Sequence, residues 1–295
     1  MDPFQAVCII LAGMAAGAIN TIVGSGSLVT FPTLLAFGYS PLVANVSNTL
    51  GLVPGSISGA IGYRRELVGQ RDRAIRLGIV AGLGGLTGGL ILLVLPASSF
   101  KAIVPFLILL ACALMAVQPR LARAMAKRDR HGEGRPTELA IGIYLTGIYG
   151  GYFGAAQGVI LLALLGIFLP DNLQRLNGLK NILAAVVNGV AAILFILFAP
   201  VNFLVAALIA IGSIVGGQVG AYVGRRLPPM ALRAAVISVG IVAALALLLA
   251  PSNPPATTPA ASPAATPAAS AALDHAERQP RTERTWNRGV DVRFA

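Results

Sequence analysis

The chain has 295 residues, of which 56% are hydrophobic and only 11% are charged, and its formal net charge is +11. Soluble domains carry about 25% charged residues, so most of the surface of this chain cannot face water. Its Lys and Arg residues lie in loops, at helix ends or in the C-terminal tail, with no basic face interleaved with aromatic residues, which excludes nucleic acid as a partner. The composition predicts a polytopic membrane protein whose main partner is the lipid bilayer.

Apolar segments follow one another along the chain until residue 250. Full-length segments should be helices, because lipid offers no hydrogen-bond partner for backbone N–H and C=O groups. Two segments are too short to span a bilayer and follow Gly-rich breaks, so we expect re-entrant helices at 27–38 and 158–169. Together the segments predict an all-α fold with about eight membrane helices. They cover 3–23, 27–38, 42–62, 76–95, 98–118, 138–153, 158–169, 178–198, 202–224 and 230–250.

The basic residues predict how the chain is oriented. The loops 63–76 and 119–137 are rich in Arg and Lys, and the positive-inside rule places both in the cytoplasm. The turn at Arg225 and Arg226 should lie on the same side, whereas uncharged turns such as 199–201 should face outward. After Ala250 the composition becomes rich in Pro, Ala and Thr, so we expect the tail 251–295 to be disordered.

The two halves of the apolar region resemble each other at a spacing of about 130 residues. Because the basic loop 63–76 corresponds to the uncharged turn 199–202, equivalent loops should lie on opposite sides of the membrane. This pattern predicts two inverted repeats, 1–118 and 138–250. The alternative, eight plain spans with parallel repeats, would place the turn at 225–226 outside. The matched residues are Gly17 with Gly147, Gly24 with Gly154, Asn48 with Asn181, Pro96 with Pro228 and Lys101 with Arg233.

The stretch NTIVGSGSLVTFP at residues 20–32 holds the first candidate binding site. Gly24 and Gly26 should break the helix, and a new helix should begin near Ser27. The N-terminus of such a half-helix exposes unpaired N–H groups and the positive end of its dipole, which together bind anions. Close packing of small residues between membrane helices is the alternative reason for the glycines. The candidate substrate-binding residues here are Asn20, Thr21, Gly24, Ser25, Gly26 and Ser27.

A second Gly-rich stretch, YGGYFGAAQGV at residues 149–159, lies at the matching place in the other half. A half-helix should begin near Gly158, and two breaks at equivalent positions point to a binding site at the interface between the repeats. Flanking polar residues should face this site, including Lys180, the cation nearest to it. Their alternative roles are interhelical hydrogen bonding and, for the lysine, snorkelling to the membrane surface. The candidate substrate-binding residues in this group are Asn48, Gly154, Gln157, Gly158, Lys180 and Asn181.

These motifs resemble those of the sulfite exporter TauE/SafE family of bacterial membrane proteins. AGAINTIVGSGSL at residues 16–28 is similar to the pattern A-G-x-I-N-T-x-x-G-G-G-S-L of one branch, and GYFGAAQGV at 151–159 resembles the second Gly-rich signature. Ser25 departs from that branch, which usually has Gly at this position. The resemblance extends over residues 3–250 and implies the export or import of small sulfur-containing or organic anions.

The carboxylates exclude several kinds of chemistry. None of the 11 Asp and Glu residues lies mid-span, so paired acids for general acid/base catalysis and a carboxylate proton relay are both missing. Cysteines in apolar runs and two histidines outside them predict neither a cofactor nor a metal site. We therefore predict a transporter, and not an enzyme, that moves a small anion, sulfite or a related organosulfur or organic anion, by alternating access in the plasma membrane of a bacterium. An anion channel and a membrane assembly factor without transport are the alternatives.

Overall fold

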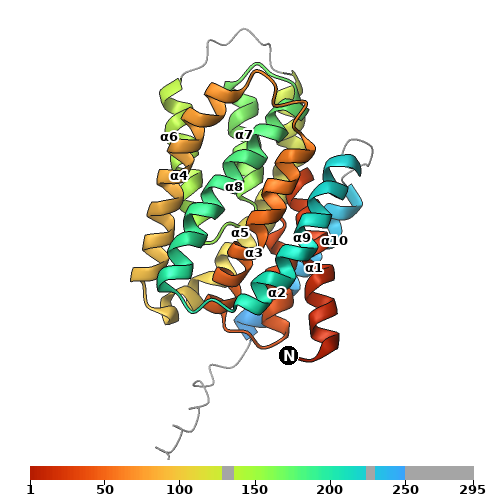
Figure 1. The fold of residues 1–295 in the computed structure, drawn as a ribbon, viewed down its shortest axis with the longest axis vertical. Coiled ribbons are helices and arrows are strands. Elements are labelled where there is room, and N and C mark those ends of the chain that lie inside the picture. Colours follow the sequence, from red (N-terminus) through yellow and green to blue (C-terminus); the bar gives the residue numbers. More distant parts are fainter. Residues whose placement is uncertain (128–135, 224–229, 250–295) are drawn as a thin grey trace, which may run out of the picture. The chain divides into compact units, whose positions relative to one another are not determined.

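The computed structural model describes residues 1–127, 136–223 and 230–249, and every regular element within these ranges is a helix (Figure 1), which confirms the predicted helical class. The first half comprises α1 (Pro3–Ile22), α2 (Ser27–Ala36), α3 (Pro41–Gly62), α4 (Arg71–Val94) and α5 (Ala97–Lys127). The second half comprises α6 (Pro136–Tyr152), α7 (Gln157–Phe168), α8 (Leu173–Phe198), α9 (Phe203–Val223) and α10 (Met230–Leu249).

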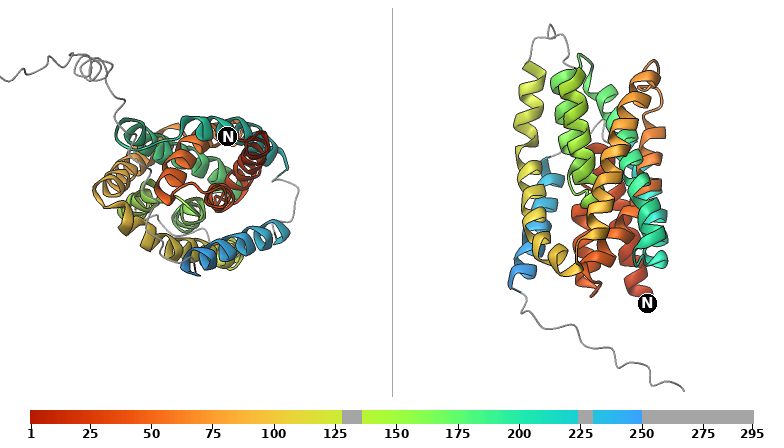
Figure 2. Two further views of the ribbon diagram at one scale, coloured as in Figure 1. Left: turned by 90° about the horizontal axis from the view of Figure 1, so that it is seen from below. Right: turned by 90° about the vertical axis from the view of Figure 1, so that its left-hand side faces the viewer.

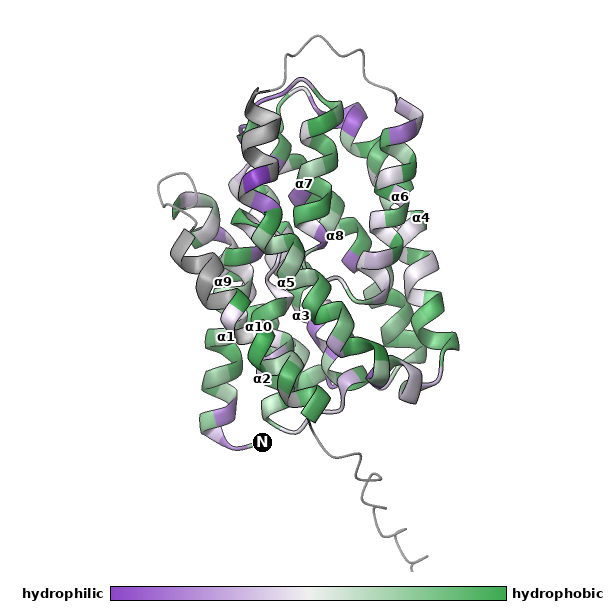
Figure 3. Cartoon of the chain, turned by 180° about the vertical axis from the view of Figure 1, so that it is seen from behind, coloured by the Kyte–Doolittle hydropathy of each residue, from purple (hydrophilic) through white to green (hydrophobic). Residues whose placement is uncertain are grey.

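Within the described residues, 5 helices are long and apolar enough to cross a membrane: α1, α4, α5 as far as Gln118, α8 and α9. Figure 3 shows hydrophobic residues along most of the length of the helices, as contact with lipid requires. The short helices α2 and α7 occupy the two segments that were expected to be re-entrant. The turn at Arg225 and Arg226, the centre of the basic loop at 128–135 and the tail lie outside the described residues, so the sidedness and disorder expected there stay predictions.

Several helices extend beyond the apolar segments that predicted them. α4 begins at Arg71 instead of residue 76, α5 continues to Lys127 instead of ending at 118, and α8 begins at Leu173 instead of 178. Arg, Lys, Gln, Met and Ala are all good helix formers, so the helical backbone continues after the apolar run has ended. An apolar run therefore marks the part of a helix that lies in the membrane, and the helix itself can begin before the run or end after it.

Each half begins with a hairpin of one long and one short helix, α1 with α2 and α6 with α7. In Figure 1, α1 begins at the end of the bundle marked N, whereas α6 begins at the opposite end, and Figure 2 agrees from the side. Each hairpin packs along a helix of the other half, since α1 lies against α9 and α6 lies against α4. α3 and α8 pack against each other between these pairs.

Glycines allow the long helices of the hairpins to approach their partners closely. A Cβ atom at Gly17 of α1 would lie 2.8 Å from Ser213 Cα in α9, and one at Gly147 of α6 would lie 2.7 Å from the carbonyl oxygen of Ala81 in α4. Real Cβ atoms are essentially never found closer than 3.0 Å to such an atom. Gly17 and Gly147, which match in the sequence, therefore serve the same packing role in the two halves.

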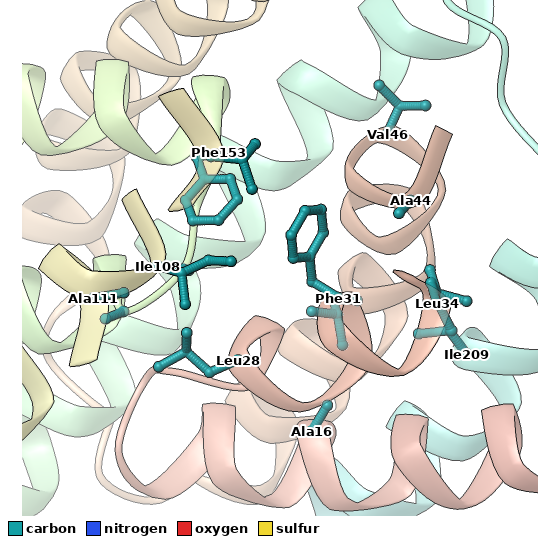
Figure 4. Packing of buried hydrophobic residues seen from close by; sticks show 14 of the residues in the cluster. Ala16, Leu28, Phe31, Leu34, Ala44, Val46, Ile108, Ala111, Phe153 and Ile209 are labelled. Carbon is teal, nitrogen blue, oxygen red and sulfur yellow. The ribbon is translucent and has the colours of Figure 1, made fainter. Parts of the chain in front are cut away.

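A cluster of buried apolar side chains surrounds the short helix α2 and the start of the second hairpin's break (Figure 4). Phe31 of α2 meets Phe153 edge to face, with ring centroids 5.4 Å apart. Phe100 of α5 packs against Phe153 from another side, at 6.4 Å. Contacts of this kind contribute about 0.5–1.5 kcal/mol beyond the burial of area. They attach α2, α5 and the second break to a common core.

Candidate functional site

The chain leaves its helical path at two breaks, residues 23–26 and 153–156. Gly24 and Gly154 have φ values of 91° and 78°, a conformation that glycine adopts without steric cost. α2 begins at Ser27, as predicted, but α7 begins at Gln157, one position before the predicted Gly158. The reason is Ala156, which has a φ of 61° and so completes the break. This left-handed conformation costs an alanine about 1 kcal/mol, and nothing in the sequence indicated it.

The two breaks touch each other through their backbones. The N–H group of Gly158 donates a hydrogen bond to the carbonyl oxygen of Gly24 over 3.1 Å. A Cβ atom on Gly158 would lie 2.5 Å from Gly24 Cα, so a side chain at this position would force the backbones apart. We call this contact, formed by residues 23–27 and 153–158, the tip junction. It joins the first hairpin directly to the second.

Backbone donors at the tip junction are only partly satisfied. In α2, the N–H groups of Leu28 and Val29 donate to the carbonyl oxygens of Ser25 and Gly26. Two short helices begin here, so the positive ends of two helix dipoles lie close together. Unpaired N–H groups at helix N-termini form ready-made anion sites. Among the described residues, no hydrogen-bond acceptor is found for the backbone N–H groups of Ser25, Gly26, Ser27, Ala155 and Ala156.

The polar face of α2 is held by one side chain of α3. Asn48 donates through Nδ2 to Ser27 Oγ over 3.1 Å, and its Oδ1 accepts a hydrogen bond from the hydroxyl of Thr30. Asn48 is only 1% exposed, so these bonds form away from water. The sequence analysis missed Thr30, although it follows Ser27 by three positions and therefore lies on the same face of a helix.

Lys180 of α8 binds the end of α1 instead of the membrane surface. Its ammonium donates to the carbonyl oxygens of Asn20 and Thr21, both over 3.0 Å, and Asn181 Nδ2 donates to Thr21 over 3.4 Å. The last carbonyls of a helix have no partner within it, and the C-terminal end of the dipole favours a cation. Lys180 is 0% exposed, so the snorkelling role considered for it is wrong.

The second hairpin is capped by neutral amides. Asn45 of α3 donates to the carbonyl oxygen of Tyr152 at the end of α6 over 3.0 Å, which parallels the action of α8 on α1. At the start of α7, Gln157 Nε2 donates to Asn188 Oδ1 over 3.3 Å. The C-terminal ends of α1 and α6 are thus capped by side chains of the other half. Asn45 and Asn188 stand out in the sequence as amides in apolar helices, but sequence alone did not assign their partners.

The predicted residues of the two breaks form the tip junction, Asn48 contacts it at Ser27, and Lys180 and Asn181 contact the end of α1 just before it. The role of the 12 predicted residues in substrate binding stays a prediction. One side chain differs from expectation: Ser25 Oγ donates to Met115 Sδ over 3.5 Å, so it is not an extra donor at the start of α2. Packing also accounts for Gly26, because a Cβ atom there would lie 2.9 Å from the carbonyl carbon of Ala16. The glycines therefore have a structural role at this place whatever the site binds.

Charge in this region is unbalanced. Among the described residues, no group of three or more His, Cys, Asp and Glu could hold a metal ion. Within the described ranges, Asp171 forms salt bridges with Arg73 and Arg175 near the first turn of α8. Neither salt bridge involves Lys180. The described carboxylates all belong to helix ends or the loops that join them: Asp2, Glu66, Asp72, Glu138 and Asp171. The ammonium of Lys180 is therefore held by carbonyl dipoles.

Comparison with known proteins gives one family. The family described as "Sulfite exporter TauE/SafE" matches residues 9–247. "Probable membrane transporter protein YfcA" of Escherichia coli (strain K12) is 28% identical over 221 residues, which are 75% of this chain and 81% of that protein. "Probable membrane transporter protein ORF9" of Sinorhizobium sp is 26% identical over 246 residues, 81% of this chain and 90% of that protein. No solved structure matches the chain significantly.

The tip junction predicts a difference between two glycine substitutions. Gly158→Ala should lower the melting temperature, because overpacking against the Gly24 backbone costs about 1–3 kcal/mol. Gly189→Ala in α8 is the matched control, since no heavy atom lies within 4 Å of the added Cβ atom. It should leave the melting temperature unchanged or raise it, because Ala favours the helix. Thermal unfolding of the two purified variants measures this, and equal melting temperatures would contradict the contact.

Proposed function

Because the chain belongs to the sulfite exporter TauE/SafE family and is a membrane transporter of that family, we propose that it carries sulfite, or a related organosulfur or organic anion. The carrier works by alternating access and lies in the plasma membrane of a bacterium. The anion binds at the tip junction, where α2 and α7 begin. The candidate residues of both breaks surround it, together with Asn48, Lys180 and Asn181.

The observation that carries this proposal is the set of unpaired N–H groups at the tip junction. A buried donor without a partner costs about 1–3 kcal/mol, so a protein retains several of them together only if something else uses them. An oxyanion accepts several hydrogen bonds at once and is attracted by the N-terminal ends of both short helices. No side-chain cation has to contact the anion directly in such a site.

Lys180 supports the same proposal through its charge. A buried ion costs several kcal/mol unless an opposite charge or good hydrogen bonds compensate for it. The ammonium has two carbonyl partners at the end of α1, and among the described residues it has no carboxylate partner. An anion at the tip junction supplies the missing negative charge. Binding the substrate therefore also stabilises the lysine that holds the first hairpin.

Unpaired acceptors near the junction define the anion further. Buried amide oxygens without a hydrogen-bond partner include Gln157 Oε1 and Asn181 Oδ1. Such oxygens repel a fully charged oxyanion but accept a hydrogen bond from one that carries a proton or a bound water. A protonated oxyanion such as bisulfite uses donors and acceptors together. Sulfite, which is in exchange with bisulfite near neutral pH, fits this mixture better than an anion that stays fully ionised.

We propose further that the two halves are inverted repeats and that transport moves the hairpins against the helices they pack on. Two features support this. α1 and α6 begin at opposite ends of the bundle, and the packing of α1 on α9 matches that of α6 on α4. Residues 1–118 and 138–250 are then the repeats, and the segment 119–137, which includes the end of α5, lies in the cytoplasm.

Loss of the Ser27 hydroxyl tests the anion site, and it also removes the acceptor of the hydrogen bond from Asn48 Nδ2. We predict that Ser27→Ala weakens substrate affinity by about tenfold to a hundredfold, the effect of one hydrogen bond to a charged ligand. Ser98→Ala is the control, because Ser98 is exposed at the start of α5. Purified variants in proteoliposomes are assayed for saturable uptake and counterflow of radiolabelled sulfite, thiosulfate and small carboxylates.

Counterflow separates a carrier from an anion channel, which passes substrate without exchange. Absence of flux for every anion, with a folded protein, would favour the assembly-factor alternative. If folded Ser27→Ala transports with the parental concentration dependence, the hydroxyl does not contact the anion. Glycine variants are poorer tests, because packing alone accounts for Gly24, Gly26 and Gly158.

Inversion predicts the sidedness of two equivalent turns. In a variant without Cys8 and Cys112, single cysteines replace Val68, which is 71% exposed in the α3–α4 loop, and Phe203, which is 60% exposed at the start of α9. A membrane-impermeant thiol reagent applied to spheroplasts should label Phe203→Cys, and should label Val68→Cys only after permeabilisation. Labelling of both from the same side would show parallel repeats.

A further inference from the structure

An apolar groove runs along the surface between α4 and α8, which lie side by side in Figure 1. Its volume is about 790 Å³. It extends from Gln70 and Arg71, at the start of α4, to Leu86 near the middle of that helix. On the α8 side it is bounded by Ile182, Val186 and Val190. The groove is separate from the tip junction and shares no residue with it.

Two glycines of α4 and two valines of α8 create the groove. A Cβ atom at Gly78 would find its nearest neighbour, Val186 Cγ2, 4.0 Å away, so the space beside this glycine is open. The corresponding interface between the two halves, formed by α3 and α9, is packed much more closely. There a Cβ atom at Gly51 would lie 2.6 Å from Ile209 Cβ. The α3–α9 interface is therefore closed by tight packing, whereas the α4–α8 interface leaves a groove that is open to lipid.

The length of the groove fits one leaflet of a membrane. The rise from Arg71 to Leu86 is about 22 Å at 1.5 Å per residue, whereas one leaflet contributes about 15 Å of hydrocarbon. The groove thus starts among the headgroups and ends near the bilayer centre. Its walls are aliphatic over this depth, which suits an acyl chain lying along α4.

Charge at the open end of the groove specifies the headgroup. Arg71 lines the groove and is exposed, and among the described residues it takes part in no ion pair. The neighbouring Arg73 differs, because Asp171 holds it over 3.1 Å. Gln70 lines the same end, but its amide donates to the carbonyl oxygens of Glu66 and Arg175 and so is already used. Exposed Asp72 is the acidic neighbour, and exposed Arg64, Arg65 and Arg76 outnumber it.

We infer that the groove binds one anionic phospholipid of the leaflet at this end, with an acyl chain between α4 and α8 and its phosphate on Arg71. A guanidinium is suited to phosphate because it can donate two parallel hydrogen bonds. The positive-inside rule makes this the cytoplasmic leaflet, whose anionic lipids are attracted by basic residues beside the membrane. The bound lipid fills the space between α4 and α8, whereas the closely packed α3–α9 interface has no such space.

Native mass spectrometry of the purified full chain tests this inference. The protein is equilibrated with equal amounts of phosphatidylglycerol and phosphatidylcholine that have the same acyl chains. Gly78→Leu places a side chain in the groove, where its Cβ atom would have Val186 Cγ2 as its nearest neighbour at 4.0 Å. Gly189→Leu adds the same side chain to α8, where nothing lies within 4 Å of the Cβ atom, and is the control. Arg71→Gln removes the charge and leaves the groove open.

The parent and Gly189→Leu should each retain one phosphatidylglycerol in preference to phosphatidylcholine. Gly78→Leu should lose this bound lipid. Arg71→Gln should keep a bound lipid, but its preference for phosphatidylglycerol over phosphatidylcholine should fall about fivefold, the effect of one basic residue at a membrane surface. Retention of the lipid by Gly78→Leu, equal binding of both lipids by the parent, or a dimer that Gly78→Leu dissociates would each overturn the inference, the last because a second copy would then occupy the groove.

Discussion

The structure depends on one constraint, that backbone polar groups buried at membrane depth need partners within the protein. Two hairpins place four helix ends in the interior, and each end leaves N–H or C=O groups without an intrahelical partner. The carbonyl ends of α1 and α6 are satisfied from the opposite half, by Lys180 and Asn181 and by Asn45. The N–H ends of α2 and α7 are left partly open. This asymmetry between capped carbonyls and open donors produces a region suited to an anion.

The tip junction couples that region to the fold. Gly24 and Gly158 touch through their backbones, so the two hairpins cannot move apart without exposing the donors between them. Because each hairpin also packs along a long helix of the other half, movement of either hairpin changes an interface between the halves. In the proposed transport cycle the anion replaces the contact between the tips. The glycines of the tip junction have two roles, because the lack of a side chain permits the close approach of the backbones and leaves the N–H groups accessible to an anion.

Sequence reasoning located the breaks well, because positive φ at Gly24 and a helix start at Ser27 follow from local residue chemistry. It also selected Asn48, which the structure places on Ser27. It did not find that Lys180 caps α1, since this contact joins residues 160 positions apart. Ala156 was missed because tertiary contacts impose its left-handed backbone against its own preference. The ends of α4, α5 and α8 were misplaced because hydropathy reports contact with lipid, while helix propensity decides where the backbone stops.

The most direct test of the anion site is cryo-electron microscopy of the protein with selenite, a heavier analogue of sulfite that scatters more strongly. The account predicts density at the tip junction, within hydrogen-bond distance of the N–H groups of Ser25, Gly26 or Ser27 and of Ala155 or Ala156. The tips should also separate enough to break the bond between Gly158 and Gly24. Density only among the exposed arginines of the α3–α4 loop, with the tips still in contact while the same protein transports sulfite, would contradict the account.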